Sequence, residues 1–275
     1  MRASLALPFV ALFGLAAWQE PTRATVELEL VYLANEGFLV RAGEHSLVID
    51  AFVTEPYGEY AAVPAALFAD LLSAKPPFQD VDLALASHAH RDHFQAKPAA
   101  EFLRARAAVR FLSSPQVADE LLAELGKHGA AARIEALLPE ARQALAAPAE
   151  GIRVELLRLP HAGGARSAEV QNLGHLIELG GVRLLHVGDA DIQTEDLAEY
   201  ALAKRALDVA LVPYWWLGNA AGVARARELT GARQLVAVHV PPAEVAAVRA
   251  HLATLDPAIL VFERPGETRK LALER

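Results

Sequence analysis

Residues 88–93 of this chain read His88-Ala89-His90-Arg91-Asp92-His93, and they place three imidazoles and a carboxylate within one hexapeptide. The hexapeptide follows the apolar run 81–86, which predicts a buried strand, so the cluster falls where a strand opens into a loop. Imidazole nitrogen and carboxylate oxygen are ligands that zinc and similar divalent ions accept. His88 and His90 are two positions apart, so both rings point the same way in an extended segment. Asp92 and His93 then point elsewhere, which predicts a second metal beside the first.

Composition limits what else the chain can be. It has 275 residues, 53% of them hydrophobic, enough for a sizeable core in one large domain or two small ones. The formal net charge is −8 with acids and bases interspersed, whereas a general nucleic-acid-binding protein would present a basic face. There is no cysteine, so any metal must be held by nitrogen and oxygen. We therefore expect no nucleic-acid partner and no thiolate site.

The N-terminus differs from the rest of the chain. Residues 1–24 comprise a short basic start, an apolar stretch and a polar segment, a layout typical of a secretory signal peptide. An uncleaved membrane anchor or a buried first helix is the alternative, although the apolar stretch is shorter than the roughly 20 residues of a stable membrane span. We expect export to the periplasm or the medium if the signal is cleaved, and otherwise a membrane-anchored protein facing outward. Residues 25–275 are then expected to form a single domain.

Strand and helix patterns alternate along residues 25–275. Alternating apolar side chains, or apolar runs bounded by turn residues, predict strands at 25–32, 37–41, 46–50, 81–86, 109–113, 152–159, 174–179, 182–187, 207–212, 235–240 and 258–262. Helical patterns occupy 63–73, 99–107, 116–128 and 245–255. This mixture predicts a layered α/β domain.

Three further ligand-type residues stand where predicted strands end. His161 follows the strand 152–159, Asp189 follows the strand 182–187 in a Gly188-Asp189 pair, and His239 lies near the end of the strand 235–240. Strand ends converge on one edge of a sheet, where loops leave room for a substrate. We therefore expect these side chains to approach the hexapeptide.

In this order, the hexapeptide, a lone histidine, a Gly-Asp pair and a late histidine resemble the metallo-β-lactamase superfamily, and residues 172–189 are most similar to its single-domain, lactonase-like branch. The resemblance implies an α/β fold, a four-layer αββα sandwich with a metal pair at the edge between two sheets. By the same resemblance, the first metal is held by His88, His90 and His161. The second is held by Asp92, His93 and His239. Asp189 would bridge the two metals, and Asp50 would be the structural aspartate beside the site.

Some of these assignments have alternatives. His175, in a Gly174-His175 pair, competes with His161 for the first metal, and Asp191 competes with Asp189; we favour His161 and Asp189. His186 is expected to be packed or to support a ligand. Four aromatic residues near the predicted site are equally compatible with core or lid packing and with substrate contact: Tyr57, Tyr60, Tyr214 and Trp215.

The chemistry expected of such a site is hydrolysis. Two divalent ions can share a hydroxide because metal binding lowers the pKa of water towards about 7. Zn²⁺ is the favoured ion, and Mn²⁺ or Fe²⁺ would suit the same ligands. We expect Asp92 to orient the nucleophile as well as to bind metal, and the substrate to be a small-molecule ester, lactone, amide or phosphodiester. A non-catalytic metal-binding sensor or scaffold, and a genuine β-lactamase, are the alternatives. The sequence fixes neither the substrate nor the oligomeric state.

Overall fold

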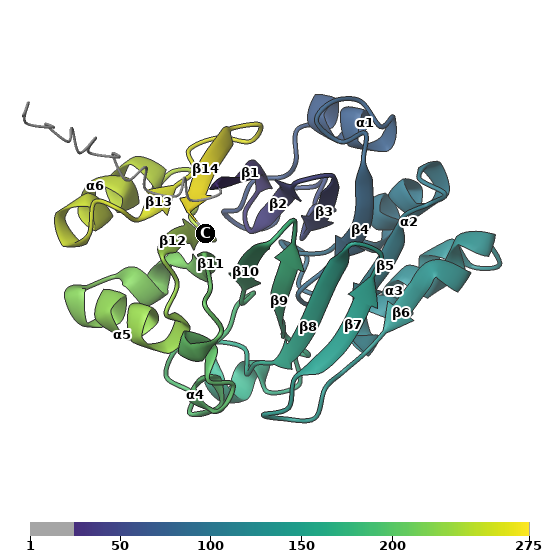
Figure 1. Ribbon diagram of the computed structural model, residues 1–275. Helices are drawn as coiled ribbons and strands as arrows, with labels where there is room; N and C mark the ends of the chain where they lie inside the picture. The colour runs from purple at the N-terminus through teal and green to yellow at the C-terminus, as the bar shows by residue number, and fades with distance from the viewer. Residues whose placement is uncertain (1–24, 275) are drawn as a thin grey trace, which may run out of the picture.

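The computed structural model describes residues 25–274, which form two seven-stranded sheets packed face to face (Figure 1). In strand order, the first sheet contains β14 (Thr268–Glu274), β1 (Thr25–Ala34), β2 (Gly37–Ala42), β3 (His45–Ile49), β4 (Val81–Leu85), β5 (Arg110–Ser113) and β6 (Ile134–Ala136). The second contains β13 (Leu260–Val261), β12 (Gln234–Val238), β11 (Val209–Pro213), β10 (Val182–His186), β9 (Leu173–Leu179), β8 (Ile152–Arg158) and β7 (Leu145–Ala149). The expected signal peptide, residues 1–24, lies outside the described residues.

The two sheets have the same pattern of strand pairing. In the first sheet, β14, β1, β2 and β3 pair antiparallel, and β3, β4, β5 and β6 pair parallel. In the second, β7, β8, β9 and β10 pair antiparallel, and β10, β11, β12 and β13 pair parallel. Strands that carry helical crossovers therefore occupy one half of each sheet, as parallel pairing requires.

Apolar side chains fill three layers. Alternation along β1 buries Leu28 and Leu30 between the sheets, while Glu27 and Glu29 point away from this central cluster. Helices on the outer face of the first sheet enclose a second cluster: α1 (Ala65–Leu72), α2 (Ala96–Ala105) and α3 (Pro115–Leu125). A third cluster lies under the helices on the second sheet: α4 (Asp196–Glu199), α5 (Ala220–Thr230) and α6 (Val245–Leu255). The expected four-layer αββα sandwich is therefore present (Figure 1).

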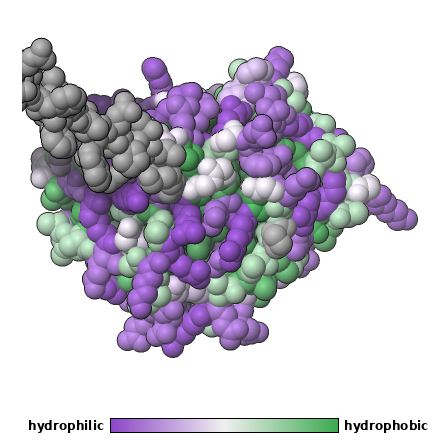
Figure 2. All heavy atoms as spheres, viewed as in Figure 1, coloured by the Kyte–Doolittle hydropathy of each residue, from purple (hydrophilic) through white to green (hydrophobic). Residues whose placement is uncertain are grey.

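Short 3₁₀ helices complete the described chain: η1 (Gly129–Arg133), η2 (Gly164–Ser167), η3 (Leu202–Lys204) and η4 (Tyr214–Leu217). Apolar residues on the face seen in Figure 2 are interspersed with hydrophilic ones, since most large apolar side chains point into the three clusters. Within residues 25–274, the helices are too short or too polar to cross a membrane.

Candidate metal centre

Seven ligand-type side chains meet beyond the ends of four strands. The hexapeptide follows β4 of the first sheet, and His161, Asp189 and His239 follow β8, β10 and β12 of the second. The structure therefore brings together all seven residues that the sequence had nominated as metal ligands. They form two neighbouring sets of donor atoms, with Asp189 between them.

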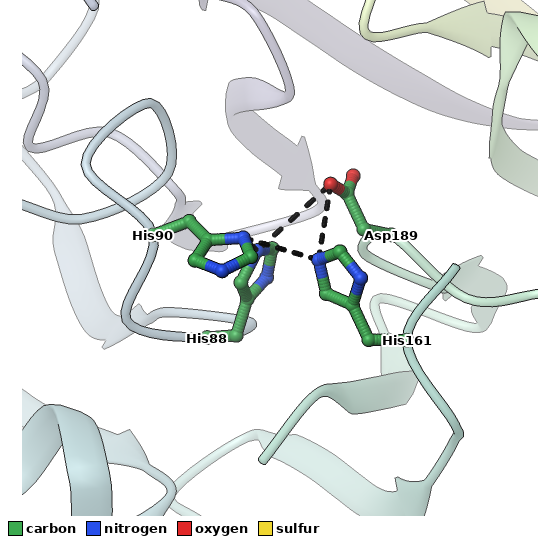
Figure 3. A group of neighbouring side chains, drawn as sticks. All are labelled: His88, His90, His161 and Asp189. Carbon is green, nitrogen blue, oxygen red and sulfur yellow. Dashed lines mark hydrogen bonds and ion pairs between the residues drawn. The ribbon is translucent and has the colours of Figure 1, made fainter. Parts of the chain in front are cut away.

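The first donor group consists of His88, His90, His161 and one oxygen of Asp189, whose side chains converge in Figure 3. His90 Nδ1 lies 3.0 Å from His88 Nε2 and 3.1 Å from His161 Nε2. Asp189 Oδ2 lies 3.3 Å from His161 Nε2 and 3.9 Å from His88 Nε2. Tetrahedral ligands about 2.0–2.1 Å from a zinc ion are separated by roughly 3.4 Å. The spacing of these four atoms fits one such ion.

The second donor group consists of Asp92, His93, His239 and the other oxygen of Asp189. Asp189 Oδ1 lies 3.3 Å from both His93 Nε2 and His239 Nε2. Asp92 Oδ2 lies 3.2 Å from His239 Nε2 and 3.7 Å from His93 Nε2. Asp189 Oδ1 and both ring nitrogens of His239 are buried and receive no hydrogen bond. A cation among these atoms would satisfy Asp189 Oδ1 and His239 Nε2, so the residues fit a second metal.

Asp50 and Ser87 orient two of the histidines. Asp50 Oδ1 accepts the Ser87 N–H at 2.7 Å, and its Oδ2 accepts the Ser87 hydroxyl at 2.6 Å and His93 Nδ1–H at 2.9 Å. Since the Ser87 hydroxyl donates to Asp50, its oxygen accepts from His88 Nδ1 at 3.0 Å. These hydrogen bonds orient both rings with Nε2 towards the donor groups, which is the role such partners play around metal-binding histidines.

Several side chains in this buried site have strongly shifted pKa values. Burial alone would raise the pKa of Asp189, but the neighbouring His93, His161 and His239 hold it well below its ordinary value. Burial would lower the pKa of His93, but Asp189 and Asp50 raise it well above its ordinary value. Burial together with His93 lowers the pKa of His88. The Asp189 carboxylate is therefore ionised at neutral pH and can bind a cation.

Asn172, which the sequence did not nominate, ties two ligand segments together. Its Nδ2 donates to the Leu159 and Val187 carbonyls at 3.3 and 3.1 Å, and its Oδ1 accepts Asp189 N–H at 3.2 Å. Gly188 adopts φ +55, and a Cβ there would lie 2.3 Å from Asn172 Oδ1. The close approach explains the glycine and fixes Asp189 relative to the strand that leads to His161.

The alternative ligands occupy other positions. His175 is buried between the sheets, and neither of its ring nitrogens has a hydrogen-bond partner. Asp191 Oδ1 accepts Gln193 N–H within its own turn. His186 is buried: its Nε2–H donates to the Glu36 carbonyl at 3.1 Å, and its Nδ1 accepts Gly188 N–H at 3.2 Å. His186 is thus part of the support of the Gly188 turn.

Aromatic side chains surround His239. The Tyr60 and Trp215 rings lie 4.3 and 4.9 Å from the His239 ring, both edge-on. Tyr214 lies 5.7 Å from Trp215, and Tyr57 is 46% exposed beneath the Arg91 guanidinium. All four aromatic residues nominated from the sequence therefore lie on the side of the second donor group or next to the loop that carries it.

Comparisons with known proteins agree with this geometry. The chain matches a family model described as a beta-lactamase superfamily domain over residues 29–230. No curated protein matches it significantly. Among solved structures, it is similar to Igni18, a metallo hydrolase from the archaeon Ignicoccus hospitalis (21% identity, TM-score 0.60, 90% of this chain and 100% of that one). It is also similar to a possible metal-dependent hydrolase from Veillonella parvula (15% identity, TM-score 0.64, 88% and 99%).

A further similar structure is CmlA, a diiron β-hydroxylase from Streptomyces venezuelae (16% identity, TM-score 0.57, 92% of this chain and 55% of that one). At such identities the structures share the fold alone, and they span more than one chemistry. The family model, however, covers well over half of the residues. The chain belongs to the metallo-β-lactamase superfamily.

Proposed function

We propose that this chain is a hydrolase that uses two divalent ions, one in each donor group, to cleave an ester, lactone, amide or phosphodiester of a small molecule. The observation that carries the proposal is the position of Asp189. Its Oδ2 faces His161 and its Oδ1 faces His93 and His239, so one carboxylate serves both groups. A bridging carboxylate holds two ions close enough to act on one substrate bond.

Ions bound in this way would supply a water of lowered pKa and polarise the scissile carbonyl or phosphoryl oxygen. The protein's own residues perform the remaining tasks. Burial would raise the pKa of Asp92, but the neighbouring His239 and His93 lower it. Asp92 is therefore an ionised acceptor that can orient a nucleophilic water. Asn35 Nδ2 holds it by donating to its backbone carbonyl at 3.0 Å.

We propose Zn²⁺ as the resident ion, because the ligands are nitrogen and oxygen in near-tetrahedral spacing. Iron and manganese accept the same atoms, and a structurally similar protein is described as a diiron enzyme. The substrate would approach along the aromatic side chains beside His239. Trp215 and Tyr57 are two of the four exposed large hydrophobic residues among those described. Such rings favour a substrate with an apolar or flat portion.

The proposal is tested by metal analysis and turnover of the purified full chain. We expect two ions per chain and hydrolysis within a panel of aryl esters, lactones, a phosphodiester and a chromogenic β-lactam. A chelator should abolish the activity and zinc should restore it. Full metal content without turnover across the panel would instead favour a metal-binding sensor or scaffold, and turnover of the β-lactam alone would favour a β-lactamase.

The double variant His88→Ala/His90→Ala tests the site itself. It removes two of the three nitrogens of the first donor group, so we expect that ion to be lost and activity to fall at least 1,000-fold, or about 4 kcal/mol. Circular dichroism should show an unchanged fold. The matched control is His45→Ala/His251→Ala, two histidines outside both donor groups, which should keep both ions. Full metal content in the first variant would contradict the assignment.

Export is proposed on the sequence of residues 1–24. Fractionation of producing cells, with N-terminal sequencing of the mature protein, tests it. A shortened chain in the periplasm or the medium is the expected result, and a full-length chain in the membrane fraction would indicate an uncleaved anchor.

A further inference from the structure

The turn between β1 and β2 presses against the second donor group. It consists of Asn35 and Glu36, both almost fully buried. Asn35 adopts φ +48, and Gly37 packs so closely that a Cβ there would lie 2.5 Å from the Asp50 carbonyl oxygen. Only glycine tolerates that approach. The turn is therefore held directly beneath the metal-binding loops.

Three segments that carry metal-donor residues form hydrogen bonds with this turn. Asn35 Nδ2 donates to the Asp92 carbonyl at 3.0 Å, and His239 N–H donates to the Asn35 carbonyl at 3.4 Å. His186, which also supports the Gly188 turn, donates to the Glu36 carbonyl at 3.1 Å. The Glu36 side chain consequently has a defined position relative to the second donor group.

That side chain is a buried carboxylate without hydrogen-bond partners. Glu36 is 0% exposed, and neither of its oxygens has a hydrogen-bond partner. Its nearest cationic candidate, His186 Nε2, lies 3.5 Å away but already donates to the Glu36 backbone. A Glu36 oxygen, a His93 nitrogen and an Asp189 oxygen all lie within 4.8 Å of one another. Burial raises the pKa of Glu36 to about 8, so the group is largely neutral at pH 7 unless a positive charge lies nearby.

The other buried glutamate shows the contrast. Glu155, in β8, is 8% exposed and receives Arg153 at 2.8 Å and Arg205 at 3.0 Å. Glu36 faces no arginine or lysine among its close partners; it faces the donors of the second group. The same charge type is thus paired within the protein at one position and left for an external cation at the other.

We propose that Glu36 is the counter-charge of the second metal position, so that binding of the ion held by Asp92, His93 and His239 depends on its carboxylate. The inference rests on the metal pair of the proposed function. It predicts that the two metal positions differ, because only the second depends on Glu36. Of the first donor group, the shared Asp189 clusters with Glu36, whereas His88, His90 and His161 do not.

The test compares the full-length wild-type chain with Glu36→Gln and the control Glu155→Gln. Zinc stoichiometry and affinity are measured by calorimetry and chelator competition, and thermal midpoints are measured with and without zinc. We expect Glu36→Gln to weaken the second zinc 10- to 100-fold, the range typical of residues just outside a metal's ligands. Its metal-free form should be about as stable as the wild type, because burial raises the pKa of Glu36 to about 8 and the metal-free carboxyl group is already largely neutral at pH 7. Glu155→Gln should lower both midpoints and leave zinc affinity unchanged.

Two further variants show which metal position loses affinity when Glu36 is replaced. In His90→Ala, which keeps the second group, adding Glu36→Gln should weaken the remaining ion; in His239→Ala, which keeps the first group, it should not. Glu36→Asp retains the charge and should retain the second ion, which separates charge from packing. Wild-type zinc affinity in Glu36→Gln, or equal loss of stability with and without zinc, would overturn the inference while leaving the proposed function intact. A wild-type chain that binds no zinc would overturn both.

Discussion

At the scale of the residue, Asp189 is the side chain on which both donor groups depend. Its two oxygens lie 3.3 Å from histidine nitrogens of different groups. Its backbone is fixed by Asn172, and the glycine before it is packed too tightly for a side chain. One carboxylate thus defines the distance between the two proposed ions.

Replacing this carboxylate should therefore affect both ions. We expect Asp189→Asn to lose at least one zinc per chain and to lower kcat/KM by 1,000-fold or more, about 4 kcal/mol of transition-state stabilisation. The matched control is Asp191→Asn, since Asp191 accepts only a local turn N–H in this structure. Elemental analysis and kinetics of the two variants provide the measurement. A larger effect at Asp191 would reverse the assignment made from the sequence.

Functional residues could be predicted from the sequence where the signal for them lies in neighbouring residues. The hexapeptide and the three residues at strand ends could be nominated because ligand-type side chains followed apolar runs. Asn172 could not, because its partners are 13 to 17 residues away along the chain. Glu36 could not, because the burial of its turn depends on segments far away in the sequence. An Asn-Glu-Gly turn between two strands is ordinarily exposed, whereas this one is buried and hydrogen-bonds to Asp92, His186 and His239.

At the scale of the element, most strands were predicted, but three of the four edge strands were missed; the fourth, β13, lies within the strand expected at 258–262. β6 has three residues, β7 is rich in alanine and contains a proline, and β14 is largely polar. These strands gain their stability from a neighbour on one side, so their own sequences carry little signal. Helix bounds also shifted: the helix expected at 116–128 is α3, which begins at Pro115 and ends at Leu125 before Gly126 with φ +59.

Two neighbouring helices on the second sheet are linked by an ion pair that predicts a pH dependence. Arg227 in α5 donates from Nε to Asp256 Oδ2 at 3.0 Å, just beyond the end of α6. This hydrogen bond lowers the pKa of Asp256 below its ordinary value of 3.8. A carboxyl group whose pKa is lower in the folded than in the unfolded state stabilises the fold at any pH above its unfolded-state pKa. This contribution is lost as the pH falls through its folded-state pKa.

We therefore expect Asp256→Asn to be less stable than the wild type at pH 7, by no more than about 1 kcal/mol because the pair is partly exposed. The difference between the two thermal midpoints should close progressively as the pH falls below 3.8. Asp196→Asn, which removes a pair with Arg142 elsewhere on the surface, serves as a comparison for general charge effects. A difference that grows at low pH would contradict the argument.

At the scale of the whole molecule, the metal centre joins the two sheets. The hexapeptide belongs to the first sheet, and His161, Asp189 and His239 belong to the second. Each donor group contains residues from both. Bound ions would therefore stabilise the packing of one sheet on the other, in addition to any chemistry.

Removal of metal should lower the thermal midpoint of the whole chain. An ion present at 100 times its dissociation constant contributes about 2.7 kcal/mol to stability, so loss of two ions is a large change. We expect a chelator to lower the midpoint by several degrees and zinc to restore it, measured by calorimetry. The His88→Ala/His90→Ala variant should respond much less. An unchanged midpoint after verified metal removal would show that the sheets do not depend on the ions.

Three of the seven described non-glycine residues with left-handed backbone lie at one end of this centre. Asn35, Asp50 and His239 adopt φ values of +48, +46 and +61, and all three side chains are buried at or beside the second donor group. Regular alternation along β12, where Val236 and Val238 face the central cluster, would direct the His239 ring to the opposite side; the left-handed turn directs it towards Asp92 instead. Such conformations cost about 1–3 kcal/mol each for residues other than glycine. The second metal position is thus the strained end of the site. There the backbone adopts less stable conformations that orient three side chains.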